Sequence, residues 1–178
     1  MANEYPPSAT DLPAEVQAML GKPLYVEQTE FPIEQGYVLS SCAASQNGNP
    51  LYWQADVAKE LTGGPIAPPT MLSVWFRPHY WAPGATEERT ALMTHFDLKR
   101  LLDLPEAVVA SNETVFGEPV RMGDVLTISQ IVRSVGELKD TKLGRGRFWT
   151  IDVETVNQRG EWVGTDTYTC LGYRKPGQ

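Results

Sequence analysis

The sequence predicts a single α+β domain in which one antiparallel sheet curls around one long central helix. In the first half, Ile33, Tyr37, Ser41 and Ala44 recur at helical spacing. In the second half, side chains alternate between apolar and polar with a period of two residues, as they do in long strands. The chain has 178 residues, 42% of them hydrophobic, which is enough for one core. Residues 1–178 are therefore expected to form one domain.

The N-terminal part is expected to contain an arm, a short strand and the long helix. Residues 1–13 are polar and contain several prolines, so we expect a loose arm. A short extended piece follows over residues 24–28. The long helix carries Ser40, Cys42 and Ala43, and such small side chains would let a curved sheet pack closely around it.

Two loops and a second helix follow. Residues 46–58, QNGNPLYWQADVA, begin as a turn, because Asn, Gly and Pro all favour turns. Residues 55–61 are expected to form a short helix, which the following TGGP ends. Residues 77–88, RPHYWAPGATEE, have the composition of a long loop, and such loops in compact domains are usually lids or interface elements.

The rest of the chain is expected to be an antiparallel meander. Residues 124–132, DVLTISQIV, and residues 147–156, RFWTIDVETV, alternate as strands do, and a Gln-Arg-Gly turn precedes a last strand. Residues 91–96, ALMTHF, are strand-like, whereas residues 96–104, FDLKRLLDL, form a helical or irregular interruption. The side chains expected to share a face are Leu126, Ile128 and Val132 in one strand and Trp149, Ile151 and Val153 in the other.

The charge of the chain argues against two classes of partner. A formal charge of -7 and a pI near 4.8 do not suit nucleic acid or an anionic membrane, which require a basic face. The sequence has no run of about 18 apolar residues. It also lacks a basic, apolar leader, so we expect a cytoplasmic protein.

A basic segment, ELKDTKLGRGRF, is the local exception. Lys139, Lys142, Arg145 and Arg147 lie within nine positions of one another, among glycines. Either the segment is a solvated hairpin turn, or it binds the phosphates of a carried substrate. For the second interpretation Arg145 and Arg147 are the candidate ligands, because guanidinium groups pair well with phosphate.

The cysteines and histidines do not predict a metal site. Cys42 and Cys170 lie far apart and lack the spacing of a zinc or redox motif, so both are expected to be small buried residues. His79 and His95 are the only histidines. With no Ser or Cys motif near either, structural roles are expected.

The order of four motifs resembles a known family. A helix with small side chains is followed by QNGNPLYWQADVA, then GGPIAPPT, then FGEPVRMGDVLT with strands after it. This order resembles the hot-dog hydratases and dehydratases of the MaoC type, in particular the N-terminal half of the fatty-acid-synthase-like dehydratases, over residues 24–174. The resemblance implies a hot-dog fold and the hydration of enoyl thioesters.

The catalytic loop of that family is changed in this chain. The family loop has the form G-D-x-N-P-L-H-x-D, and the resemblance implies that its Asp and His add water across the double bond. Here the Asp position falls on Asn47 and the His position on Tyr52, while Asn49, Pro50 and Leu51 match. Hydration requires one group to accept a proton and another to deliver one. An amide cannot accept it, and an unperturbed Tyr has a pKa of about 10, so both are poor substitutes.

A second departure concerns the oxyanion donor. The resemblance implies that an I-A-H-G segment gives a backbone N–H to the thioester oxygen. In this chain Pro68 and Pro69 occupy the matching positions, and proline has no N–H. We therefore expect a chain that lacks the usual donor as well as the catalytic pair.

The resemblance also implies that hot-dog halves work in pairs, either fused or as two chains. We expect a subunit of a heteromeric (R)-type enoyl-CoA hydratase or 3-hydroxyacyl-thioester dehydratase. This subunit would shape the acyl pocket, while a second hot-dog chain supplies Asp and His. The substrate would be carried on coenzyme A or an acyl-carrier protein, with no other cofactor.

Large side chains near the changed loop are candidates for an acyl pocket, although ordinary core packing would also explain some of them. Their density favours a bulky acyl group, such as a steroid side chain or an aromatic acid. The candidates for substrate binding are Asn49, Trp53, Pro68, Pro69, Trp75 and Trp81, with Phe76 and Tyr80 as further bulk.

Two other functions stay open. The chain could be a self-sufficient homodimer that hydrates or hydrolyses thioesters with Asp56 or His95. It could also be a non-enzymatic acyl-CoA-binding protein that kept the fold and lost the reaction.

Overall fold

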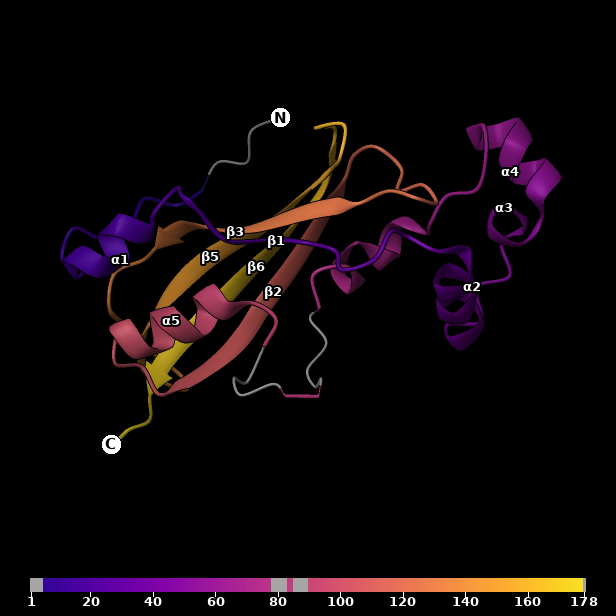
Figure 1. Ribbon diagram of the computed structural model, residues 1–178. Coiled ribbons are helices and arrows are strands. Elements are labelled where there is room, and N and C mark those ends of the chain that lie inside the picture. The colour runs from indigo at the N-terminus through magenta and orange to yellow at the C-terminus, as the bar shows by residue number, and fades with distance from the viewer. Residues whose placement is uncertain (1–4, 78–82, 85–89, 178) are drawn as a thin grey trace.

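The computed structural model describes residues 5–77, 83–84 and 90–177. These residues form a six-stranded sheet in the order β1-β3-β5-β6-β2, with β4 paired to β5 (Figure 1). All neighbouring strands are antiparallel. The expected meander holds for β3, β5 and β6, whereas β2 pairs with β6 rather than with β3. The strands are β1 (Pro23–Gln28), β2 (Glu106–Phe116), β3 (Leu126–Val135), β4 (Lys139–Thr141), β5 (Gly144–Asn157) and β6 (Trp162–Arg174).

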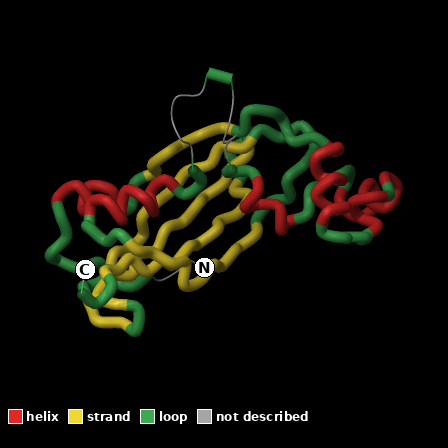
Figure 2. The backbone as a smooth tube through the Cα atoms, turned by 90° about the horizontal axis from the view of Figure 1, so that it is seen from below, coloured by secondary structure: helices red, strands yellow, loops and turns green. Residues whose placement is uncertain are grey.

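The helices form two groups. α1, η1 and α5 pack on the sheet, whereas α2, α3 and α4 gather beyond one end of it (Figures 1 and 2). The bounds are α1 (Ala14–Met19), α2 (Gln35–Ala44), α3 (Pro50–Trp53), α4 (Ala55–Thr62), the 3-10 helix η1 (Pro69–Val74) and α5 (Met93–Leu101).

The helix that we expected at the centre of the sheet lies elsewhere. α2 has only ten residues, and it stands past the end of the strands (Figure 1). Val38 and Cys42 are its only buried residues, while the small side chains of Ser40 and Ala43 face solvent. Because small side chains bury little apolar surface, this helix is attached by one narrow stripe. The sheet is covered instead by the shorter α5 and η1.

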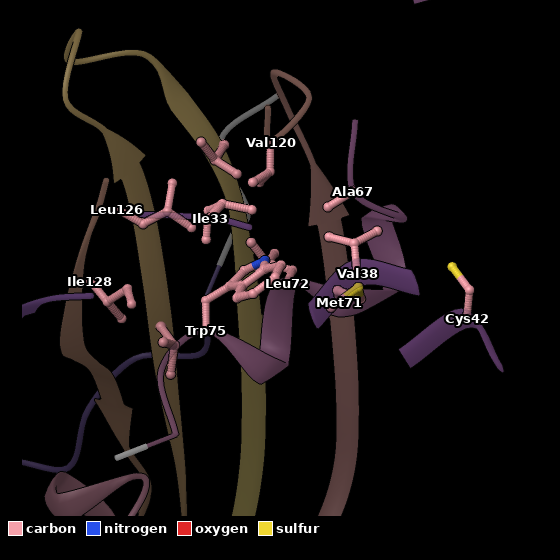
Figure 3. Packing of buried hydrophobic residues seen from close by; sticks show 12 residues of the cluster. Ile33, Val38, Cys42, Ala67, Met71, Leu72, Trp75, Val120, Leu126 and Ile128 are labelled. Atoms are coloured by element: carbon pink, nitrogen blue, oxygen red, sulfur yellow. The ribbon is translucent and has the colours of Figure 1, made fainter. Parts of the chain in front are cut away.

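The core consists of two clusters on the same face of the sheet. The first, here called the α5 cluster, contains Ala9, Leu12, Val16, Leu98, Leu104, Val132, Val135, Trp149, Ile151 and Cys170. The second, the η1 cluster, contains Ile33, Val38, Cys42, Ala67, Met71, Leu72, Trp75, Val120, Leu126, Ile128, Val153 and Val163 (Figure 3). The side chains expected to share the core faces of β3 and β5 are all buried, and so are both cysteines.

The N-terminal segment, expected to be loose, is attached to the sheet over its described part. The backbone N–H of Ala9 donates to the carbonyl of Val135 at 2.8 Å, and the Val135 N–H donates to Ser8 Oγ. Leu12 is buried in the α5 cluster. Residues 5–13 are held because two apolar side chains and these hydrogen bonds outweigh the polar composition.

α5 begins earlier than the sequence indicates. ALMTHF is not a strand, because the helix begins at Met93. Its first turn is capped from outside: Oε1 of Gln130 on β3 accepts from the backbone N–H of Thr94 at 3.0 Å and from its hydroxyl at 2.8 Å. The first of these bonds satisfies one N-terminal backbone donor that Leu92, at the N-cap, cannot satisfy.

β2 is a long edge strand. Its eleven residues pair with β6 on one side only, and it carries exposed apolar side chains, among them Val109 and Phe116. Edge strands of this kind are open to pairing with another chain. In the described part of the chain, no helix has the length and hydropathy required to cross a membrane.

Candidate functional site

A cavity of about 690 Å³ lies between β1, the segment that follows it and the end of η1. Its volume falls within the range of about 300–1,000 Å³ that is typical of small-molecule sites. Ile128 and Gln130 of β3 line it from the middle of the sheet. The wall residues are Tyr25, Glu27, Gln28, Thr29, Glu30, Phe31, Pro32, Ile33, Glu34, Tyr37, Val74, Trp75, Phe76 and Arg77.

The two ends of the cavity differ in their neighbours. At one end lie Glu34 and Tyr37, at the start of the helix that leads into the changed loop. At the other end lie Tyr25 and Gln130, which bond to α5. The cavity therefore extends from the loop side of the molecule to the α5 side.

The α5 end is rigidly built. Tyr25 has a positive φ of 48°, at a break in the register between β1 and β3. Such a backbone is costly for a bulky residue, and here it is held by the phenol, which donates to Asp97 of α5. The carboxylate of Asp97 raises the pKa of Tyr25 to about 12, with burial as a second cause. Tyr25 therefore stays neutral and fixed at physiological pH.

The changed loop is held together by its own side chains. Oδ1 of Asn49 accepts from the Leu51 N–H and caps α3, and Oδ1 of Asn47 accepts from the Asn49 N–H at 3.2 Å. The indole N–H of Trp53 donates to the Asn47 carbonyl at 2.7 Å. Asn47, Asn49 and Trp53 thus maintain the turn, and none of them lines the cavity.

Tyr52 has a different environment. Its ring is half-buried and packs against the η1 cluster. Burial raises the pKa of its phenol above the ordinary value, so the group is neutral at physiological pH. It can donate a hydrogen bond, but it is an even weaker source of protons than a free tyrosine.

The two prolines lie at the start of η1. Pro69 is the first residue of the helix, where a missing N–H costs nothing, and the carbonyl of the buried Pro68 accepts from Met71 at 2.9 Å. The nearest N–H, that of Ala67, already donates to Val120 at 2.8 Å. This turn therefore offers no free backbone donor from residues 67–69.

Trp75 is the candidate pocket residue that does line the cavity. Its ring is 9% exposed, packs edge-on against Tyr37 at 5.7 Å and lies beside Ile33 and Leu72 (Figure 3). Its neighbour Phe76 lines the cavity too. Trp81, with Tyr80 and His79, falls outside the described residues.

The two arginines proposed for phosphate differ. Arg147 is buried, and its guanidinium binds both carboxylate oxygens of Asp11, at 2.6 and 3.0 Å, and the Gly136 carbonyl. It joins the N-terminal segment to β5, and because both terminal nitrogens of its guanidinium are already hydrogen-bonded, few donors remain for a phosphate. Arg145 is exposed on the hairpin of β4 and β5. Neither residue lines the cavity.

The candidates for a self-sufficient enzyme are separate from each other. Asp56 is exposed in the first turn of α4. His95 lies on α5 with its ring 5.5 Å from that of Trp149, and burial lowers its pKa, so it is neutral. Neither lines the cavity, and the described residues contain no cluster of ligands suited to a metal ion.

Sequence reasoning missed a buried carboxyl, Asp166 on β6. It is 2% exposed; one oxygen accepts from the Thr114 hydroxyl and the other has no hydrogen-bond partner. Burial raises the pKa of this carboxyl, more than Thr114 and the charge of Arg77 lower it. Strand alternation places Asp166 on the same face as Tyr168 and Cys170, and that pattern could have found it.

Comparisons with known proteins agree with this architecture. The family described as "FAS1-like, dehydratase domain region" matches residues 18–166. A probable enoyl-CoA hydratase alpha subunit from Thermomonospora curvata is 28% identical over 177 residues, which cover 94% of this chain and 53% of that protein. The chain thus spans about half the length of this curated relative.

Solved structures show the same fold. The ChsH1-ChsH2 complex from Mycobacterium tuberculosis has a chain with a TM-score of 0.75 and 22% identity, covering 93% of this chain and 90% of that one. The C-terminally truncated HadBC (3R-hydroxyacyl-ACP dehydratase) complex from the same organism gives 0.57 and 19%, covering 85% and 96%. An (R)-hydratase from A. caviae gives 0.53 and 18%, covering 91% and 98%.

Proposed function

Since the chain belongs to the FAS1-like dehydratase family, with the hot-dog fold of MaoC-like hydratases, we propose that it is the acyl-binding subunit of a heteromeric (R)-type enoyl-CoA hydratase or 3-hydroxyacyl-thioester dehydratase. The observation that carries the proposal is a cavity of acyl size that reaches the start of α2, the helix that leads into a loop which keeps its turn and lacks an acid and a base. Binding is retained on this chain, and proton transfer is assigned to a second hot-dog chain.

The loop supports a division of labour. Hydration requires a group that takes a proton from water and a group that protonates the α-carbon. Asn47 has no basic nitrogen and its side-chain oxygen already accepts a backbone bond. Tyr52 is neutral and packed into the η1 cluster. A second chain with intact Asp and His would complete the reaction.

The edge strand β2 supports the presence of a partner. It offers unpaired backbone groups along eleven residues, and Val108, Val109, Val115 and Phe116 are exposed on it. An edge of this length would bind the edge strand of another sheet. Two of the structural relatives are complexes, ChsH1-ChsH2 and HadBC, which fits this assignment.

The cavity supports a bulky acyl group. Trp75 and Phe76 form one wall, with Ile33 and Ile128 as further apolar surface. Aromatic walls of this kind suit a large, rigid acyl group, such as a steroid side chain or an aromatic acid. The carrier would be coenzyme A or an acyl-carrier protein, with Arg145 as a candidate for phosphate contact.

The test is the loss of enoyl-thioester absorbance when an enoyl-CoA is added to this chain alone and to the chain co-expressed with a hydratase-like partner that has Asp and His. The proposal expects turnover in the mixture only. Turnover by this chain alone, abolished by Asp56→Asn or His95→Gln, would instead establish a self-sufficient enzyme. Binding without turnover with every candidate partner would establish an acyl-CoA-binding protein.

Two variants make this test sharper. Asn47→Ala is expected to lower the turnover of the pair far less than loss of a proton-transfer group would, because this side chain holds the turn and carries no chemistry. Val109→Lys on β2 should leave the fold intact, since the position is 54% exposed, but should prevent co-purification with the partner. Co-purification of the Lys variant at wild-type yield would exclude β2 as the interface.

A further inference from the structure

Gln130 lies at the α5 end of the cavity, and within the described part of the chain only the oxygen of its side-chain amide is hydrogen-bonded to the protein. It lines the cavity and is 8% exposed. Its Oε1 accepts two hydrogen bonds, from the N–H and the hydroxyl of Thr94. Because a backbone N–H can only donate, the atom that faces Thr94 must be the oxygen, and the orientation of the amide is fixed by chemistry.

The NH₂ group of Gln130 therefore points away from Thr94. No described residue accepts a hydrogen bond from it. The two N–H groups of this amide are therefore free to donate to a molecule in the cavity. Since the side chain borders the cavity, the missing acceptor has room to bind there.

The neighbouring residues show at which end of the cavity the Gln130 NH₂ group lies. Tyr25 is the neighbouring end residue, and its phenol is committed to Asp97. The opposite end lies at Tyr37, on the helix that leads into the changed loop. Along β1 each residue advances about 3.3 Å, so residues 25–29 alone span roughly 13 Å. A thioester at the loop side would thus place the far end of its acyl group near Gln130.

We infer that Nε2 of Gln130 binds an oxygen, carbonyl or hydroxyl, at the far end of the acyl group. This inference rests on the proposed function, since it takes the cavity to be the acyl site. It specifies the substrate class: an acyl thioester whose apolar part lies against Trp75 and Ile128 and which carries an oxygen at its far end.

The experiment uses two saturated thioesters, which cannot be hydrated, so that binding is measured apart from turnover. Decanoyl-CoA and its 9-oxo counterpart have the same length and differ in one oxygen. Isothermal titration calorimetry with the purified chain is expected to give a Kd about three- to tenfold lower for the 9-oxo thioester, the value of one hydrogen bond. Equal Kd values would overturn the inference.

Gln130→Glu is the decisive variant at pH 8. It keeps the oxygen that caps α5 and replaces the donor NH₂ by a second oxygen. The preference for the oxo thioester over decanoyl-CoA, measured as the ratio of the two Kd values, should disappear or reverse. Thr94→Val is the matched control, because it removes a bond to the same side chain and leaves the NH₂ in place. A preference that persists in the Glu variant, or is lost equally in the Val variant, would contradict the inference.

The outcomes separate the inference from the proposed function. Oxo-selective binding without hydration by any partner pair would keep the inference and refute the hydratase subunit. Hydration by the pair, with no preference for the oxo thioester, would support the hydratase subunit and refute the inference about Gln130. Failure of both thioesters to bind the chain would overturn the inference and argue against an acyl site on this chain.

Discussion

The two core clusters differ in how completely they are covered. The α5 cluster is closed by the N-terminal segment, α1 and α5, and Val16, Leu98 and Trp149 in it are inaccessible to solvent. The η1 cluster borders the cavity, and Tyr37, which packs on Trp75, is 53% exposed. The same sheet face is thus fully covered at one end and borders a cavity at the other.

The largest effect is expected in the closed cluster. Trp149→Ala should lower the free energy of unfolding by about 3–5 kcal/mol, as for other fully buried large side chains. Its ring fills the space over Gly172, where even a Cβ would lie 2.1 Å from the indole. Urea denaturation measures the change. If Trp149→Ala lost less free energy of unfolding than Trp75→Ala, the α5 cluster would not be the more completely covered of the two.

Trp75→Ala should be less costly, because part of its surface borders a space rather than packed atoms. A loss of about 1–3 kcal/mol in urea denaturation is expected, since fewer contacts disappear. The variant should also enlarge the cavity and move acyl preference toward bulkier thioesters in the hydratase pair. Unchanged acyl preference would remove Trp75 from the pocket.

Asp166→Asn tests the buried carboxyl, and it should stabilise the protein. The folded-state pKa is raised, so the native protein retains the proton more strongly, and Asp166 lowers stability as pH rises above its unfolded value of 3.8. At pH 7 the neutral amide should therefore raise the free energy of unfolding. Melting curves from pH 4 to 8 should show the gain at neutral pH and its decline toward pH 4. An equal gain at both pH values would exclude the titration of Asp166 as its cause.

The smallest effects are expected for the two arginines, and they should differ between Arg147 and Arg145. Arg147→Gln should lower the melting temperature, because it releases the N-terminal segment from β5. Arg145→Gln should leave the melting temperature unchanged and raise the KM for the thioester if Arg145 contacts phosphate. Thermal denaturation and initial rates of the hydratase pair measure both. A KM unaffected by Arg145→Gln would remove this residue from the site.

The sequence predicted β1, β3, β5 and β6, the turn at Asn47 and the helix at residues 55–61, because local patterns determine these elements. It did not single out β2, and its strand-like interpretation of residues 91–96 was wrong. It could not place α2, since helical periodicity is the same for a central and a peripheral helix. The bond between Asp11 and Arg147 joins residues 136 positions apart, and no local pattern reports such a pair. The cavity could not be predicted for the same reason, because the residues that line it come from separate segments that only the fold brings together.

The order of the strands has a consequence for biosynthesis. β2 leaves the ribosome well before β6, which is its only neighbour in the sheet. At about 5–20 residues per second, the chain between Phe116 and Trp162 takes roughly 2–9 s to synthesise. Throughout that interval β2 has no strand to pair with, and its valines are open to aggregation. A chaperone or a partner chain that captures this nascent edge would protect the protein at its most vulnerable stage.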